Sequence, residues 1–75
     1  MMLERIKLIL SEFTDEDLTD VTENTDIQYE LGFDSLQMMN LAVALEQEFG
    51  VVISDDDAAA IVTVADVLRL VSEGA

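Results

Sequence analysis

Apolar residues recur at helical spacing close to the start of the chain. Leu3, Ile6, Leu10 and Phe13 follow one another at intervals of three, four and three residues. That spacing places them along one stripe of an α-helix, which is the stripe that packs against a core. The pattern therefore predicts a first helix over residues 2–13.

The stretch from residue 14 to residue 33 lacks that periodicity. Thr, Asp and Asn are frequent in it, and their side chains compete with regular structure for backbone hydrogen bonds. A loop this long in so short a chain is usually functional or contains a short turn of helix. We expect its scattered apolar residues to pin it over the core; they are Leu18, Val21, Ile27, Tyr29 and Leu31.

A second helix is predicted from Asp34-Ser35, whose side chains suit a helix cap, to about Phe49. Gly32 lies just before it, and Gly50 is suited to ending it. This segment is apolar around most of its circumference. A helix of that kind is central in its fold, or turns one apolar flank toward a partner.

Two further helix starts follow. Ser54 opens a short helix that reaches about Ala60, and Thr63 precedes a last helix that continues to about Ser72. The chain contains no proline and no internal repeat. We therefore predict an all-α fold, with residues 1–75 as one domain. It is a four-helix bundle with three longer helices, a short third helix and a long loop between the first two.

The charge of the chain is strongly one-sided. Seventeen Asp and Glu residues oppose three basic residues, Arg5, Lys7 and Arg69, which gives a net charge of −14 at pH 7. Such a field repels nucleic acids and anionic membrane surfaces, and it attracts basic patches on other proteins. We therefore expect no nucleic-acid partner and no membrane partner.

Several chemistries lack the residues that they need. The chain has no cysteine and no histidine, so it offers neither a thiolate nor the commonest general base. Asp55-Asp56-Asp57 lacks the alternating ligands, the glycine and the final Glu of a calcium loop, and we interpret it as charge that complements a helix N-terminus. We expect no enzyme and no metal site. No secretory leader or membrane-spanning run is visible, so we expect a cytoplasmic location. We also expect the chain to be a monomer.

The most informative stretch is Glu30-Leu31-Gly32-Phe33-Asp34-Ser35-Leu36. It places the hydroxyl of Ser35 after a loop glycine and at the start of a helix. Backbone N–H groups at such a place are unpaired, and the helix dipole favours an anion. The chain provides no base suited to activating Ser35 as a nucleophile. We therefore interpret Ser35 as a residue that another enzyme modifies.

The chain resembles the acyl carrier protein family, in its discrete form, over essentially its whole length. The similarity is carried by Asp34-Ser35-Leu36 preceded by Leu31-Gly32, and by the segments Ala44–Phe49, Ile53–Asp55 and Ile61–Val64. The resemblance implies that a phosphopantetheinyl transferase moves 4′-phosphopantetheine from coenzyme A onto Ser35. It also implies that acyl groups are held as thioesters on that arm. Acyl-transferring, condensing and modifying enzymes of fatty acid or polyketide biosynthesis would receive them.

The resemblance also implies two sets of residues around Ser35. Partner enzymes of the family dock basic patches along the second helix, and the corresponding residues here are Asp34, Leu36, Met39, Val43, Glu46, Glu48 and Asp55. The bundle interior in the family can shelter an acyl chain, and the expected lining here is Leu45, Ile53, Ile61 and Leu68. By spacing alone, Leu36, Met39 and Val43 fit a core position better, since they share one flank of the helix.

The chain departs from the family of fatty acid carriers in two ways. Those carriers often have acidic residues one and two turns into the second helix, where this chain has Gln37 and Asn40. Phe33 before Asp34-Ser35 is common in polyketide carriers. We therefore favour a specialised pathway, with polyketide or unusual acyl chains. The alternatives are a peptidyl or aminoacyl carrier, which usually has glycine before Asp-Ser and less negative charge, and a non-carrier acidic interaction module, which leaves the Ser35 segment unexplained.

Overall fold

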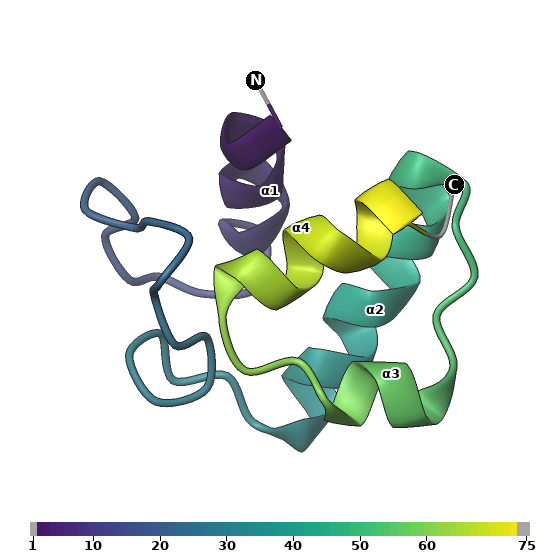
Figure 1. The fold of residues 1–75 in the computed structure, drawn as a ribbon. Coiled ribbons are helices and arrows are strands. Elements are labelled where there is room, and N and C mark those ends of the chain that lie inside the picture. Colours follow the sequence, from purple (N-terminus) through teal and green to yellow (C-terminus); the bar gives the residue numbers. More distant parts are fainter. Residues whose placement is uncertain (1, 74–75) are drawn as a thin grey trace.

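The computed structural model describes residues 2–73, which fold into four α-helices (Figure 1). Their bounds are α1 Met2–Leu10, α2 Ser35–Phe49, α3 Asp55–Ala59 and α4 Val64–Glu73. The all-α class, the short third helix and the long loop between the first two helices are confirmed. In Figure 1, α4 crosses over α2, α1 stands to one side, and α3 lies beside the first turns of α2.

The helices bury aliphatic side chains where they face one another. α1 packs against both α2 and α4, and α3 packs against α2. The fully buried large side chains come from helices and loops alike; they are Ile6, Leu10, Ile27, Leu41, Leu45, Ile61, Val64 and Val67. Each of them contributes roughly 1.5–3 kcal/mol relative to an exposed position, so even a chain this short forms a defined core.

The first helix is shorter than predicted. It ends at Leu10, and the residues up to Phe13 continue as a turn. The N–H groups of Glu12 and Phe13 donate to the carbonyls of Ile9 and Leu10, three residues back (3.1 and 3.0 Å). This is the tighter pattern in which many helices end. Apolar spacing could not reveal it, because Phe13 still packs against the core.

The long loop of residues 11–34 is pinned to the core as predicted, with one exception. Of its predicted anchors, the buried ones are Val21, Ile27 and Leu31, and Leu18 is half-buried. Tyr29, by contrast, is 88% exposed, so its prediction as an anchor was wrong. Asp26 closes a turn there, because its carboxylate accepts the N–H of Tyr29 (2.7 Å) and its carbonyl accepts that of Glu30 (2.9 Å). This turn leaves the Tyr29 side chain in solvent.

Main-chain hydrogen bonds join this loop to the connection between α3 and α4. Asp26 and Thr63 form an isolated antiparallel bridge. Beside it, the N–H of Ile27 donates to the carbonyl of Val62 (2.8 Å). The loop is therefore held to the fold by backbone pairing as well as by burial.

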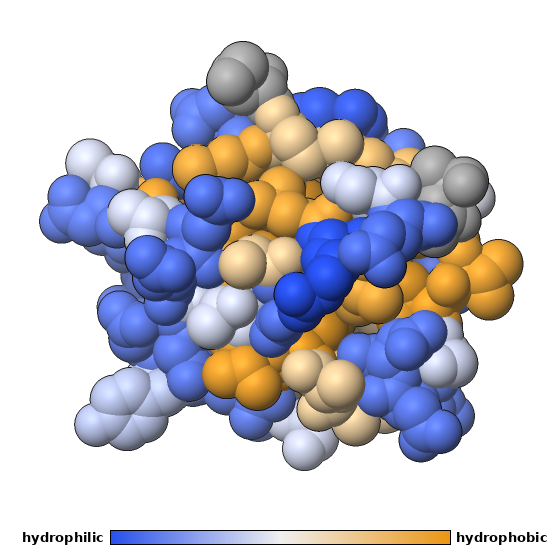
Figure 2. Space-filling view, in the orientation of Figure 1, coloured by the Kyte–Doolittle hydropathy of each residue, from blue (hydrophilic) through white to orange (hydrophobic). Residues whose placement is uncertain are grey.

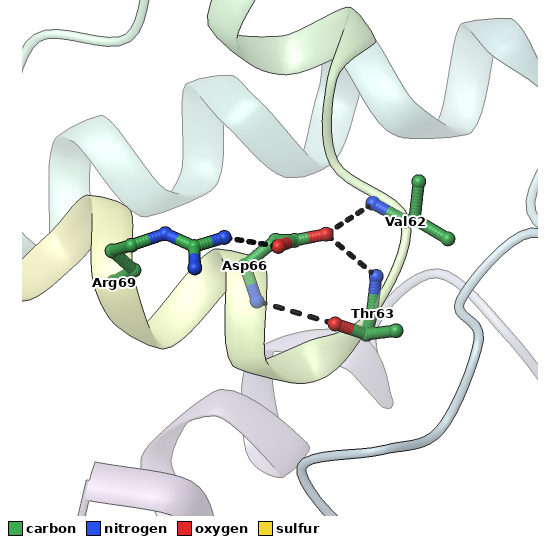
Figure 3. Close-up of polar contacts among 4 residues, drawn as sticks. All are labelled: Val62, Thr63, Asp66 and Arg69. Atoms are coloured by element: carbon green, nitrogen blue, oxygen red, sulfur yellow. Dashed lines mark hydrogen bonds and ion pairs between the residues drawn. The ribbon is translucent and has the colours of Figure 1, made fainter.

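A reciprocal capping arrangement begins α4, directly after Thr63 as predicted (Figure 3). The carboxylate of Asp66 accepts the N–H groups of Val62 (2.9 Å) and Thr63 (3.0 Å), and the Thr63 hydroxyl accepts the N–H of Asp66 (3.4 Å). Arg69 forms an ion pair with the same carboxylate. The backbone bonds from Thr63 and Val62, helped by Arg69, lower the pKa of Asp66 below its ordinary value, because they stabilise the charged form.

The surface is unevenly polar. In the orientation of Figure 1, hydrophilic side chains dominate the side of the long loop, whereas apolar patches lie open around α4 (Figure 2). Across residues 2–73, no helix combines the length and the apolar character that crossing a bilayer requires.

Candidate attachment site at the start of α2

Ser35 is the first residue of α2, and it is exposed. The cap of this helix is Asp34, whose backbone is extended (φ −94°, ψ −177°). Its carboxylate accepts the N–H of Gln37 (2.8 Å), and the Gln37 side-chain oxygen accepts the N–H of Asp34 (3.0 Å). This pair forms a capping box, which satisfies two N–H groups at the helix end. The capping function thus belongs to Asp34, and the Ser35 hydroxyl is not needed for it.

The segment before Ser35 is held from both sides. Gly32 has a φ of 74°, a conformation that side chains other than glycine rarely adopt. This turn lies between Leu31 and Phe33, both of which are buried. Their burial anchors the chain immediately before the cap, so Ser35 projects from a well-defined point of the surface.

An open groove lies between Ser35 and α3. Its volume is about 400 Å³, and it is lined by Gln28, Ser35, Met38, Met39, Asp55, Ala58 and Ala59. Four of these seven residues are apolar, namely Met38, Met39, Ala58 and Ala59. A flexible chain attached at Ser35 would therefore find an apolar surface directly beside its attachment point.

The negative charge of a phosphodiester at Ser35 would be stabilised by the backbone at the start of α2 and not by basic side chains. All three basic residues of the chain are in ion pairs elsewhere, Arg5 with Glu48, Lys7 with Glu4 and Arg69 with Asp66. The positive end of the α2 dipole and the first-turn N–H groups that are not bonded to Asp34 remain as the local support for an anion. The Ser35 hydroxyl therefore fits a covalently attached phosphodiester group.

Leu36, Met39 and Val43 form one open flank of α2. Their side chains are 67%, 58% and 51% exposed, although their spacing also fitted a core position. The opposite flank of the helix supplies Leu41 and Leu45 to the interior. The core contacts of α2 are thus made without Leu36, Met39 and Val43, which lie on the surface next to Ser35.

The acidic residues predicted to flank this surface have different environments. Glu48 pairs with Arg5 (2.9 Å), and Glu46 accepts the N–H of Ile53 (2.8 Å). Asp34 is the helix cap, and Asp55 is exposed at the first position of α3. Three of the four predicted docking acids therefore also have a role inside the fold.

The four residues expected to line an acyl pocket lie together in the hydrophobic core. Leu45, Ile53 and Ile61 are buried, and Leu68 is half-buried against the same hydrophobic core. None of the four lines the groove beside Ser35. The groove beside Ser35 and the expected acyl pocket are therefore formed by different residues.

The acidic side chains are also candidate metal ligands. In the part of the chain that the structure describes, no three Asp or Glu side chains are grouped so that they could hold a metal ion. Asp55, Asp56 and Asp57 lie in the first turn of α3, where their charges complement the helix dipole.

Residues 4–71 match the protein family described as the phosphopantetheine attachment site. The chain belongs to the acyl carrier protein family. Carriers of this family hold phosphopantetheine covalently and are not themselves catalytic.

Solved structures, two acyl carrier proteins among them, have the same fold. An acyl carrier protein from Thermotoga maritima is 32% identical, with a TM-score of 0.84; the match covers 97% of this chain and 85% of that one. The 3,7-dioxo-octyl actinorhodin acyl carrier protein from Streptomyces coelicolor is 29% identical, with a TM-score of 0.84 and coverages of 96% and 87%. A chain in the structure of the ishigamide ketosynthase/chain length factor is 30% identical, with a TM-score of 0.76 and coverages of 97% and 92%.

Two features of this carrier were not predicted from its sequence. One is the groove, because Gln28, Ala58 and Ala59 are brought to Ser35 only by the packing of the loop and α3. The other is the role of Gln37 in the cap. An Asp followed three residues later by Gln before an apolar run is a readable capping signal, so this second feature could have been found.

Proposed function

We propose that Ser35 is the residue that receives the 4′-phosphopantetheine arm, and that this carrier delivers acyl groups to biosynthetic enzymes. The observation that carries the proposal is the exposed Ser35 hydroxyl at the first position of α2, directly after an independent cap at Asp34. The family match over residues 4–71 supports it. When attached, the arm supplies a thiol that holds acyl groups as thioesters.

The chain's own residues contribute attachment, orientation and recognition. Ser35 provides the oxygen of the ester bond to phosphate, and the first turn of α2 stabilises the phosphate charge. Leu36, Met39 and Val43 form the contact surface for the phosphopantetheinyl transferase and the later enzymes, supported by their exposure. Asp55 adds negative charge at the edge of that surface.

The acids of α2 contribute less to recognition than their number suggests. Glu48 is partly neutralised by Arg5 and Glu46 is engaged by Ile53. Charges at the edge of an interface mainly affect the association rate and the choice of partner. We therefore assign the main docking contact to the apolar flank of Leu36, Met39 and Val43, with the acids in a secondary role.

The acyl pocket expected from the resemblance requires the core to open. Leu45 and Ile61 are fully buried, so an acyl chain would reach them only by displacing side chains between the groove and the interior. Our proposal is that the groove between α2 and α3 receives the chain first, and that Leu45, Ile53, Ile61 and Leu68 surround its distal part.

The proposed pathway is a specialised one, using polyketide or unusual acyl chains. Phe33 and Asn40 support this choice, and the similarity to the actinorhodin carrier is compatible with it. Gln37 no longer supports it, because that side chain has a structural role in the helix cap. Efficient charging and elongation by a purified fatty acid synthase system would contradict the specialised assignment.

One experiment tests the attachment. The chain is incubated with coenzyme A and a broad-specificity phosphopantetheinyl transferase, and its intact mass is measured. We expect the mass to rise by one phosphopantetheinyl group, and Ser35→Ala to abolish the gain. Ser72→Ala removes another exposed helical hydroxyl and should leave the gain unchanged. An unmodified wild-type chain, or a modified Ser35→Ala variant, would refute the proposal.

We also propose that the carrier acts as a monomer in the cytoplasm. Serial delivery to several enzymes requires the flank of Leu36, Met39 and Val43 to be free between encounters. Light scattering after size exclusion would measure the mass of the particle, and a stable dimer would contradict this part of the proposal.

A further inference from the structure

Gln37 takes part in two hydrogen bonds with its one side-chain amide. Its oxygen accepts the N–H of Asp34 (3.0 Å), while its nitrogen donates to the carbonyl of Phe13 (2.7 Å). Phe13 lies in the turn that follows α1. The amide therefore joins the end of α1 to the residue that immediately precedes Ser35.

A neutral amide can make both bonds, because it contains a donor and an acceptor. A carboxylate at position 37 could accept from Asp34 but could not donate to Phe13, and its oxygen would face the carbonyl oxygen. The groove beside Gln37 is also lined by Glu12, Asp15 and Glu16, so a further negative charge would be repelled there. The structure thus gives a local reason for Gln at a place where many carriers have an acid.

The bond to Phe13 acts on the part of the helix that is least restrained. The first N–H groups of a helix have no partner one turn back, so this end frays readily. In α2 the N–H groups of Gln37 and Met38 both bond to Asp34, at 2.8 and 2.9 Å. The Phe13 link fixes this capped turn to a neighbouring element, which local capping alone cannot do.

We propose that Gln37 is a positioning residue for Ser35: through Phe13 it ties the first turn of α2 to the end of α1 and so holds the Ser35 hydroxyl in the orientation that the modifying enzyme requires. This inference rests on the proposed function of Ser35. The chemical reason is that transfer requires the attacking oxygen in a defined geometry, and a displacement of about 1 Å can lower a rate by roughly 100-fold.

Two substitutions separate the bonds. Gln37→Glu keeps the acceptor for Asp34 and loses the donor to Phe13, whereas Gln37→Met loses both at similar volume. The matched controls are Gln47→Glu and Gln47→Met, at an exposed position of the same helix. Steady-state modification kinetics are measured with saturating coenzyme A over a range of carrier concentrations, at a temperature where circular dichroism shows every variant to be folded.

We expect kcat to fall about tenfold for both Gln37 variants and to stay unchanged for both Gln47 variants. The control Gln47→Glu matters because an added charge acts mainly on encounter, and therefore on KM. Unchanged kcat values for the Gln37 variants, with or without a change in KM, would overturn the inference.

Amide hydrogen exchange gives a second readout that needs no enzyme. The Met38 N–H bonds to the Asp34 carbonyl (2.9 Å) and reports on the first turn of α2. We expect its exchange to become about fivefold faster in both Gln37 variants, as for loss of one hydrogen bond, with the Leu45 amide unchanged. Unchanged Met38 exchange would also overturn the inference. Failure of the wild-type chain to become modified would instead refute the function proposed for Ser35.

Discussion

The guanidinium of Arg5 lies 2.9 Å from the carboxylate of Glu48 and joins α1 to the last turn of α2. The same guanidinium lies over the ring of Phe49, 4.5 Å from its centre. The ion pair is about half exposed, so solvent screens it and its contribution is modest. The ring contact adds a second attraction, between Arg5 and Phe49, in which Glu48 takes no part.

Arg5→Ala should therefore destabilise the fold more than Glu48→Gln. We expect about 1–2 kcal/mol for Arg5→Ala, which loses both contacts, and about 0.5 kcal/mol for Glu48→Gln. Urea unfolding followed by circular dichroism measures both. Lys7→Ala is the control, since it removes the same charge from a more distant pair (3.8 Å) and should cost less than Arg5→Ala. Equal effects of Arg5→Ala and Lys7→Ala would show that only net charge matters.

Asp66 makes the stability of α4 sensitive to acid. Its folded-state pKa lies below the ordinary value of 3.8, chiefly because of hydrogen bonds from Thr63 and Val62. A lowered pKa means that its stabilisation is complete above about pH 4 and is lost as the pH falls further. Asp66→Asn should lower the free energy of unfolding by about 1 kcal/mol at pH 7 and should flatten its decline below pH 4.

Chemical denaturation at pH 7, 4 and 3 would measure this difference. Asp20→Asn removes an equal charge from an exposed loop position and should leave the acid dependence close to that of the wild type. If Asp66→Asn and wild type lost stability in parallel below pH 4, the capping carboxylate would not be the group responsible.

Self-repulsion among the acidic residues should make the melting temperature depend on salt. At 0.01 M ionic strength the screening length is about 30 Å, longer than the largest dimension of the protein, 28 Å. At 0.15 M it is about 8 Å, so most of the repulsion from the net charge of −14 is removed. We expect the melting temperature to rise by about 5 °C, which corresponds to about 1 kcal/mol in a domain of this size.

Differential scanning calorimetry in NaCl, choline chloride and MgCl₂ would test this prediction. Equal effects of the two monovalent salts at equal ionic strength would indicate screening, and an additional effect of Mg²⁺ would indicate diffuse divalent binding. A melting temperature that is constant or falls between 0.01 and 0.15 M NaCl would contradict the repulsion argument.

Two leucines of α2 should separate stability from recognition. Leu45 is fully buried, whereas Leu36 is 67% exposed beside Ser35. Leu45→Ala should cost about 2–5 kcal/mol of stability by leaving a cavity. Leu36→Ala should change stability by no more than about 0.5 kcal/mol while lowering the kcat/KM of modification about tenfold. Denaturation and modification kinetics measure the two effects, and a normal kcat/KM in Leu36→Ala would argue against the proposed docking flank.

The helix limits could largely be predicted because they depend on neighbouring residues. Gly50 ends α2 with a φ of 69°, and Ser54 caps α3 by accepting the N–H of Asp57 (3.1 Å). Such signals act within one turn of a helix. The end of α1 and the exposed Tyr29 were predicted wrongly because apolar character alone does not specify a turn.

The candidate site was only partly predictable. The place of Ser35 at the start of α2 follows from the residues next to it. The bonds of Gln37 to Phe13 and of Arg5 to Glu48 join residues 24 and 43 positions apart. No local pattern indicates such pairs, because they depend on how α1 and α2 are packed.

By itself, the sequence determined four helical segments, the residues that begin the last three of them and the hydroxyl of Ser35 at a helix start, since local hydrogen bonding and spacing decide these features. Tertiary structure alone decided which flank of the nearly apolar α2 faces solvent. Leu36 and Leu41 are equally hydrophobic, yet one is 67% exposed and the other fully buried. The physical reason is that α1 and α3 pack against α2 on limited parts of its surface, and what they leave uncovered surrounds Ser35.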